Sequence, residues 1–380
     1  MITFSIYSTP GASADLSGIL GVSMSLSVGI VGLPNVGKST LFNALTGNSI
    51  LAANYPFATI EPNTGIVPIP DERLEKLAML YATKKVVPAT VTFVDIAGLV
   101  RGASQGEGLG NQFLSHVREC QAICQVVRAF EGSAVTHVND RIDPADDIEL
   151  INTELILADI QTLEKRLSTF EKQARLNPKL MPALGTYKNA LAYLNTGKLL
   201  NTTDVDVEHL NDLHLLTVKP FIYIFNVSEA EIADSNVKQK FMQMVAPSQA
   251  VCICAKLEEE LRSLDAGEAQ ELLASYGQDE SGLIQLVRAA YDALGLQSYL
   301  TAGPDEVRAW TIKKGATAPQ AAGAIHTDFE KGFIAAQVVD YDDLISLGSE
   351  TAAKAAGKMR TEGKDYVMQP GDVVEFRFNV

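Results

Sequence analysis

Gly32-Leu-Pro-Asn-Val-Gly37-Lys38-Ser39 is the stretch that decides the fold, because it matches the P-loop pattern G-x-x-x-x-G-K-[ST]. In such a loop, backbone N–H groups converge on phosphate oxygens, and glycine permits that close approach. Ser27–Val31 is typical of a strand before the loop, and Thr40–Leu45 is typical of the start of a helix after it. This context favours a phosphate-binding loop over a chance glycine-rich turn.

The loop predicts chemistry as well as a fold. We expect Lys38 to bridge the β- and γ-phosphates of a nucleoside triphosphate during hydrolysis, and Ser39 to ligate Mg²⁺. The N-terminal end of the following helix adds positive potential for the phosphates. The predicted nucleotide-binding residues of the loop are Gly32, Asn35, Val36, Gly37, Lys38, Ser39 and Thr40.

Later motifs follow predicted strands, where α/β sheets collect ligands. Asp95-Ile-Ala-Gly98 comes after the strand Thr90–Val94, so Asp95 can hold Mg²⁺ through water while the Gly98 N–H contacts the γ-phosphate. Thr59, between this motif and the P-loop, is either a second metal ligand on a switch loop or a turn threonine, and we favour the switch. Base-contacting loops are expected after two further strands, at Asn226, Val227, Glu229 and Lys256.

The pattern of apolar residues changes twice along the chain. From Met24 onward, strands and helices alternate, which predicts a parallel α/β sheet. Residues 146–204 instead carry two helical stripes broken by Pro178 and Pro182, which predicts an inserted antiparallel helical hairpin. After a closing helix at Gly282–Leu294, residues 297–380 are typical of a small α+β domain, with strands at Val307–Ile312, Gly332–Val338 and Val373–Phe378 around a helix at Ala318–Ile325.

Composition limits the function classes. The net charge of −15 argues against general attraction to nucleic acid or anionic lipid, although a local basic patch remains compatible with it. Four cysteines are too few for a disulfide framework in 380 residues, so we expect buried free thiols and a reducing cytoplasm. No apolar run reaches the roughly 20 residues of a membrane helix. Residues 1–23 contain no Lys or Arg and are assigned only as an N-terminal extension.

Together these residues resemble the Obg-related P-loop family called YchF, or Obg-like ATPase. The resemblance covers essentially everything after Met24. It implies a GTPase-like domain at residues 24–296 interrupted by the 146–204 hairpin, a C-terminal TGS domain of β-grasp type at 297–380, and an association with ribosomes. The stretches that carry it are Gly32–Thr40, Tyr55–Asn63, Asp95–Ser104, Gly106–Arg118, Asn152–Asp159, His326–Phe333 and Tyr366–Val380.

The resemblance also implies an unusual base preference. Guanine-specific relatives carry N-K-x-D, whereas this chain has Val227 in place of the Lys and Glu229 in place of the Asp. The family with this N-x-x-E form is similar in preferring ATP. On physical grounds the change removes guanine selection without itself creating adenine selection. An ATPase switch, a GTPase and a nucleotide-sensing binding module therefore stay open as readings.

Three positions concern catalysis and regulation. Leu99 replaces the water-orienting Gln of Ras-like enzymes, and the resemblance implies a histidine substitute that we assign to His116; the alternative is a surface histidine. Asn35 either helps to hold K⁺ beside the phosphates or caps the loop. Ala58 stands where many relatives have Cys, which puts thiol-based regulation there in doubt. Basic residues of the last domain, Arg308, Lys313, Lys314 and Lys331, form either an RNA-binding face or a solvated surface.

Overall fold

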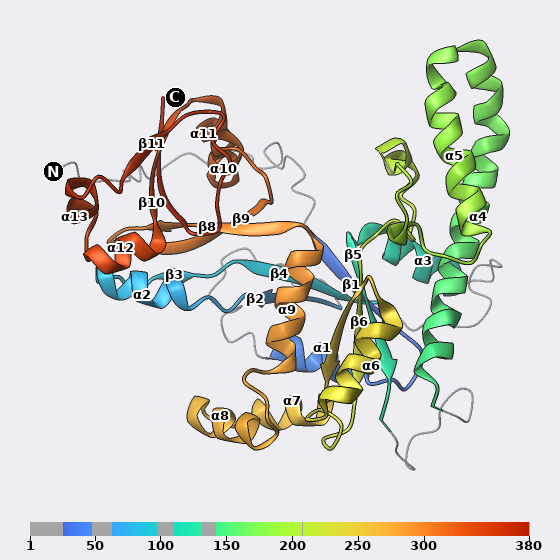
Figure 1. Ribbon diagram of the computed structural model, residues 1–380, viewed down its shortest axis with the longest axis horizontal. Coiled ribbons are helices and arrows are strands. Elements are labelled where there is room, and N and C mark those ends of the chain that lie inside the picture. Colours follow the sequence, from blue (N-terminus) through green and yellow to red (C-terminus); the bar gives the residue numbers. More distant parts are fainter. Residues whose placement is uncertain (1–25, 48–62, 97–108, 131–141, 207, 380) are drawn as a thin grey trace, which may run out of the picture.

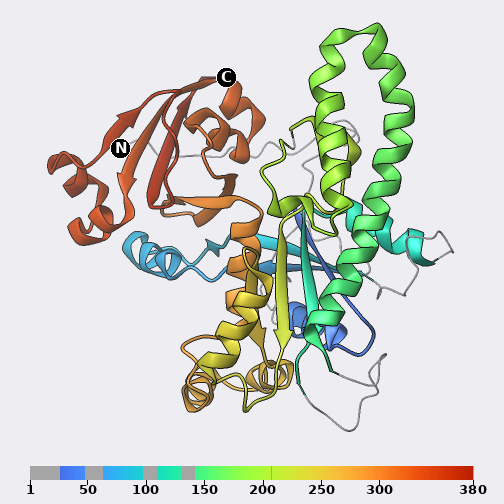
Figure 2. The same cartoon turned by 45° about the vertical axis from the view of Figure 1, so that its right-hand side comes forward.

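The computed structural model describes residues 26–47, 63–96, 109–130, 142–206 and 208–379. These form an α/β body, a helical hairpin that projects from it, and a second sheet formed mainly by the C-terminal residues (Figures 1 and 2). The predicted extension at 1–23, together with Ala58, Thr59, Gly98 and Leu99, lies outside the described residues.

The first sheet has six strands in the order β2-β4-β1-β5-β6-β7. Only β2 runs antiparallel to its neighbour; the other neighbouring pairs are parallel, as the alternating pattern predicts. The strands are β1 (Ser27–Gly32), β2 (Thr64–Pro68), β4 (Thr90–Asp95), β5 (Ala122–Arg128), β6 (Phe221–Asn226) and β7 (Gln249–Ile253).

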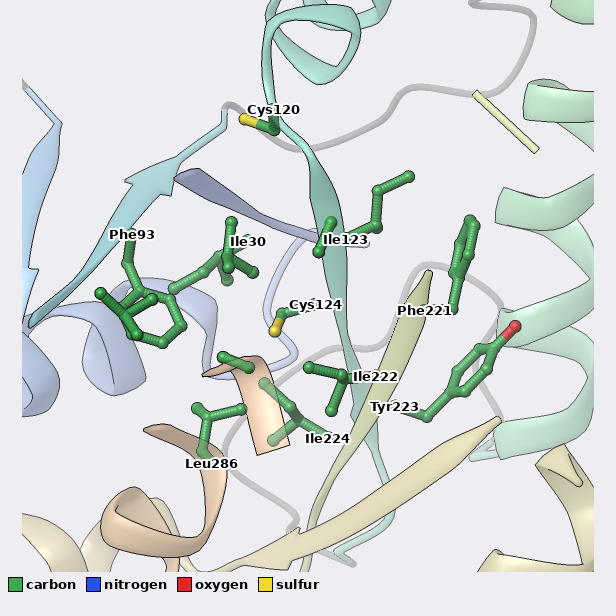
Figure 3. Close-up of a cluster of buried hydrophobic side chains, with 14 of the residues drawn as sticks. Ile30, Phe93, Cys120, Ile123, Cys124, Phe221, Ile222, Tyr223, Ile224 and Leu286 are labelled. Atoms are coloured by element: carbon green, nitrogen blue, oxygen red, sulfur yellow. The ribbon is translucent and has the colours of Figure 1, made fainter. Parts of the chain in front are cut away.

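Helices cover both faces of this sheet. Alternate residues of β6 point to opposite sides, as Figure 3 shows: Ile222 and Ile224 face Leu286 of α9, whereas Tyr223 points the other way. There its hydroxyl accepts from Asn152 of α4 (Pro144–Leu176) at 3.4 Å. The helices of the body are α1 (Lys38–Gly47), α2 (Glu72–Tyr81), α3 (Leu109–Glu119), α6 (Ser235–Val245), α7 (Ala255–Leu261), α8 (Ala266–Ser275) and α9 (Gly282–Ala293).

The hairpin consists of α4 (Pro144–Leu176) and α5 (Met181–Leu194), joined by the short 3₁₀ helix η4 (Pro178–Leu180). Asp143 caps α4 by accepting from the Asp146 N–H at 3.3 Å. The helical run is interrupted between Leu176 and Met181, and Pro182 lies in the first turn of α5, where a missing N–H costs nothing. The return to β6 passes through η5 (Leu200–Thr202) and η6 (Glu208–Leu213).

The second sheet is mixed, in the order β11-β10-β12-β8-β9-β3, where β3 is Val86–Val87. It includes a strand that the sequence did not reveal, β8, which pairs antiparallel with β9 and parallel with β12. The elements are β8 (Leu296–Ala302), β9 (Val307–Lys313), α10 (Ala318–Ile325), α11 (Thr327–Lys331), β10 (Phe333–Asp340), α12 (Tyr341–Leu347), α13 (Glu350–Ala355), β11 (Arg360–Glu362) and β12 (Asp372–Phe378).

The two sheets are linked by a short strand from the first part of the chain, which joins the second sheet. β3 (Val86–Val87) lies between α2 and β4 in the chain, yet it pairs with β9, Val86 opposite Val307 and Val87 opposite Arg308. Lys85 adds an ion pair to Glu306 at 2.6 Å. The region 24–296 is therefore not structurally separate from the C-terminal sheet, since it supplies that sheet's edge strand.

Candidate nucleotide site

The P-loop lies at the carboxyl end of β1, between that strand and α1. Gly37 has φ of +93°, and a Cβ there would lie 2.4 Å from the Asn226 side-chain nitrogen. A Cβ at Gly32 would lie 2.9 Å from the Val126 carbonyl oxygen. Gly32 is thus required by the close approach of β5, whereas Gly37 is required by the Asn226 side chain and by its own backbone conformation.

A cavity of about 610 Å³ opens over this loop, lined by Leu33, Pro34, Asn35, Gly37, Lys38, Ser39, Thr40, Asn63 and Asp95. Lys38 forms an ion pair with Asp95, and both side chains are largely shielded from solvent. Ser39 and Thr40 are exposed in the first turn of α1. The structure therefore brings the predicted phosphate-binding lysine, the predicted metal carboxylate and the predicted hydroxyl ligand together at one cavity.

Oxygen donors of this kind suit Mg²⁺, which prefers hydroxyl, carboxylate, phosphate and water oxygens. Ser39 and Asp95 line the same cavity, so the residues present fit that ion. In the described part of the chain, no three His, Cys, Asp or Glu side chains gather as a metal site of their own. A magnesium ion here would depend on a nucleotide for part of its coordination, as in other phosphate-transfer sites.

A second cavity of about 690 Å³ adjoins the first and shares Asn35, Gly37 and Thr40 with it. Its walls include the residues predicted to contact the base, Asn226, Val227, Glu229 and Lys256. The sequence did not single out Phe130, which also lines this cavity. The Arg128 guanidinium lies over the Phe130 ring, 4.6 Å from the centroid of that ring. The sequence signal that could have indicated Phe130 is Arg128, a buried arginine at the end of an apolar strand.

Asn226 has a positioning role that the sequence did not predict. Its side-chain nitrogen donates to the Val36 carbonyl at 3.0 Å, and its side-chain oxygen accepts from the Ala255 N–H at 3.2 Å. The residue is 7% exposed, so these bonds are well shielded. Asn226 thereby ties the P-loop to the start of α7, which fixes the phosphate half of the site relative to the base half.

The two residues that depart from the guanine motif occupy different environments. Val227 is 2% exposed, and its N–H donates to the Ile253 carbonyl at 2.9 Å. Glu229 instead pairs with Lys256 at 2.6 Å, and that hydrogen bond raises the pKa of Lys256. Lys256 was expected on a loop, but it lies in the first turn of α7, because β7 ends at Ile253 and the helix begins at Ala255.

His116 is not brought to either cavity. It is exposed near the end of α3, and that end leads into β5, whose first residue Ala122 lies opposite Val28 near the start of β1. The P-loop follows the other end of β1. The Lys219 ammonium holds this end of α3, donating to the carbonyls of Val117 at 2.8 Å and Arg118 at 2.7 Å and also to that of Cys120. The role assigned to His116 therefore requires α3 to leave the position described.

The cysteines and the predicted basic face can also be placed. Cys120, Cys124 and Cys254 are buried and Cys252 is half-buried, and all four are free thiols. Among the basic residues of the last domain, Arg308 pairs with Glu306 at 2.8 Å and Lys314 with Asp292 at 2.9 Å.

Among the helices of the described residues, none combines the length and the apolar character that a membrane span requires.

The loop, the lysine–aspartate pair and the parallel sheet define a P-loop nucleotide-binding protein of the GTPase type. Residues 27–166 match a family model described as "50S ribosome-binding GTPase", and residues 296–379 match one named YchF-GTPase_C, described as "Protein of unknown function (DUF933)". A "Ribosome-binding ATPase YchF" of Bacillus subtilis is 51% identical over 94% of this chain and 100% of the relative. One of Escherichia coli O157:H7 is 50% identical over the same shares.

A solved structure gives the same result. The "Schizosaccharomyces pombe YchF GTPase" superposes with a TM-score of 0.83 and 41% identity, over 93% of this chain and 98% of the other. The chain belongs to the YchF family. The resemblance found in the motifs and the predicted fold class are thereby confirmed.

Proposed function

We propose that this protein is a Mg²⁺-dependent P-loop ATPase that hydrolyses ATP to ADP and phosphate and acts as a nucleotide-dependent switch on ribosomes in the cytoplasm. The bacterial relatives are named ribosome-binding ATPases, whereas the Schizosaccharomyces pombe relative is named a GTPase. The names of the relatives therefore do not distinguish ATP from GTP, so the choice between them is argued from the residues of the base cavity.

The observation that carries the choice of ATP is the state of Val227 and Glu229. A buried Val227 offers no amine above the base, and the Glu229 carboxylate is held by Lys256 beside the cavity. Guanine recognition uses a carboxylate that accepts from two guanine N–H donors. Because Lys256 holds the Glu229 carboxylate, a guanine in this cavity lacks the acceptor for its two N–H donors, which disfavours its binding.

The phosphate half suggests how binding begins. Lys38 must exchange the Asp95 carboxylate for phosphate oxygens when a nucleotide enters, which frees Asp95 for a water-mediated contact to the metal. Magnesium, when bound, neutralises charge on the phosphates. Thr59 and the Gly98 N–H complete this proposed set as second metal ligand and γ-phosphate contact. K⁺ beside Asn35 remains a further proposal, supported by the position of Asn35 at both cavities.

Affinity and turnover with ATP and GTP, side by side, test the proposal. Calorimetry on the purified full chain should show tighter binding of ATP. Val227→Lys with Glu229→Asp should shift preference toward GTP, and Glu229→Asp alone guards against misfolding caused by a buried lysine. Glu271→Asp, on the exposed face of α8, is the matched control. Tighter GTP binding by the unmodified protein would reverse the assignment to ATP.

The ribosome link is tested separately. Purified ribosomes should co-sediment with the protein in a manner that depends on the bound nucleotide, and they should change its ATP turnover. RNA contact through the last domain is a weaker proposal, since two of its four candidate cations are already paired with acids. Turnover unaffected by ribosomes, with no co-sedimentation in any nucleotide state, would leave an ATPase without the proposed partner.

A further inference from the structure

The far end of the hairpin has a charge unlike the rest of the chain. Residues 172–203, which run from the end of α4 through α5 and η5, contain five Lys or Arg residues and no Asp or Glu, in a protein of net charge −15. Three of the five lie at the far end, around the turn between the two helices. Lys172, Arg175 and Lys179 are exposed, and none of them has an ion pair to an acid in the part of the chain that the structure describes. We call residues 172–181 the hairpin tip.

The same tip exposes large apolar side chains. Leu176 is 88% exposed and Met181 is 53% exposed, at the end of α4 and the start of α5. Figures 1 and 2 both show this end of the hairpin standing away from the body and from the C-terminal sheet. This apolar surface is therefore exposed to solvent and is not covered by any other part of the chain that the structure describes.

The hairpin below the tip is well packed, so this exposure is not a sign of an unfinished core. The rings of Phe170 and Tyr187 lie 4.8 Å apart across the two helices, with Ala174 and Leu184 buried beside them. Asn177 caps the turn by accepting from the Lys179 N–H at 3.2 Å. The tip is thus presented on a rigid support, which lowers the entropic cost of binding a partner.

We propose that the hairpin tip binds RNA on the ribosome, with Lys172, Arg175 and Lys179 contacting backbone phosphates and Leu176 and Met181 packing against exposed bases or riboses. This inference rests on the ribosome association proposed above. Lys172 and Arg175 are three residues apart, so they share one face of α4. An acidic chain is repelled by RNA overall, which makes an acid-free, unpaired basic end the surface that fits phosphates.

The test uses the full chain with Lys172, Arg175 and Lys179 all changed to Gln. Removing three phosphate contacts should weaken co-sedimentation with purified ribosomes about 10- to 100-fold at moderate salt, and should lower the salt slope of log affinity by about 2 to 3. The matched control changes Lys76, Lys84 and Lys240 to Gln, which removes the same charge from exposed positions outside the hairpin. ATP turnover without ribosomes should be the same for all three proteins.

A 20-nucleotide single-stranded RNA provides a second arm, in which the tip variant should bind more weakly than the control variant. Leu176→Ser with Met181→Ser should weaken ribosome binding while leaving the salt slope unchanged. Equal ribosome binding by the tip variant and the unmodified protein would overturn the inference but leave the ribosome proposal intact. Lost ribosome binding with an unchanged salt slope and unchanged RNA binding would also overturn it, because it would identify a protein partner.

Failure of the unmodified protein to bind ribosomes would instead count against the proposed function. The RNA-binding experiment would then test the hairpin tip without ribosomes. Equal RNA affinity of the tip variant and the control variant would overturn the inference.

Discussion

Two lysines at opposite ends of the same sheet are held in contrasting ways. Lys38, at the carboxyl end of β1, faces a single carboxylate, Asp95, beside an open cavity. Lys219, just before β6, donates to three backbone carbonyls at the end of α3. Lys38 has one partner that a phosphate can replace, whereas all of the donors of Lys219 are engaged in holding a helix. A lysine whose partner a ligand can replace is typical of a binding site, whereas a lysine bonded only to backbone carbonyls has a structural role. We call the three hydrogen bonds from Lys219 to the end of α3 the structural lock.

The surroundings of Lys219 extend that lock to the hairpin. Asp159 of α4 is fully buried and accepts from the N–H groups of Leu216 and Thr217, at 3.0 and 2.8 Å, and from the Thr217 hydroxyl. Arg118 of α3 contacts Thr162 of α4 at 3.3 Å. The end of α3 is therefore joined to α4 both directly and through the segment before β6.

Breaking the exchangeable site should have the largest effect. Lys38→Ala removes the fixed charge at the phosphates, and ATP turnover should fall by about 100- to 1000-fold or more, as for loss of a donor aimed at developing charge. Ser39→Ala should lose productive Mg²⁺–nucleotide binding in the same way. Single-turnover assays on folded protein measure this, with Lys240→Ala on α6 as the control. Normal turnover by Lys38→Ala would remove the P-loop from the chemistry.

The contrast also shows what the sequence can predict. The P-loop, Asp95 and the strand that precedes Asp95 are local patterns, so the spacing of their residues along the chain determines their geometry. Lys219 contacts residues about a hundred positions away, and β3 pairs with β9 across more than two hundred, so no local periodicity reveals them. Asn226 was predicted by its motif, but its tether to Val36 depends on how close β6 lies to the P-loop.

Breaking the structural lock should change stability rather than chemistry. Lys219→Met should lower the free energy of unfolding by about 1 kcal/mol, because three carbonyls lose their donor while the cost of desolvating the ammonium is also removed. Chemical denaturation of both proteins measures this. Turnover at saturating ATP should stay close to that of the unmodified protein, and a loss of turnover without a loss of stability would contradict the structural role.

The same pair of proteins gives a pH test. Desolvation lowers the pKa of Lys219 to about 8, below the ordinary value near 10.5 that applies to the unfolded chain. Between these values the unfolded state binds more protons, so the contribution of Lys219 to stability rises with pH. The stability difference between the unmodified protein and Lys219→Met should therefore grow from pH 7.5 to pH 9.5. Buried tyrosines titrate in both proteins and cancel in this difference. Cys120 interacts electrostatically with Lys219, so it is changed to Ala in both proteins. A constant difference would show that the ammonium keeps its ordinary pKa.

The smallest effect is expected at His116, and it tests whether the lock holds during turnover. His116 is exposed on the end of α3 that Lys219 fastens, at the edge of the sheet away from the P-loop. With α3 in place, the imidazole cannot orient water at the γ-phosphate, so His116→Ala should hydrolyse ATP within about twofold of the unmodified rate. A positioned acid–base group would be worth about 10- to 100-fold or more.

The matched control for this prediction is His209→Ala, which removes an exposed imidazole from η6, outside both cavities. Single-turnover hydrolysis without ribosomes measures both variants, and the binding of ATP should be unchanged in both. A loss of about 10-fold or more in His116→Ala alone would mean that α3 leaves its position in each cycle. In that case Lys219→Met, by loosening the end of α3, should raise the rate of the unmodified His116 protein. If neither His116→Ala nor Lys219→Met alters hydrolysis, α3 stays in its position during turnover. The attacking water must then be oriented by other groups of the chain or by a partner acting in trans.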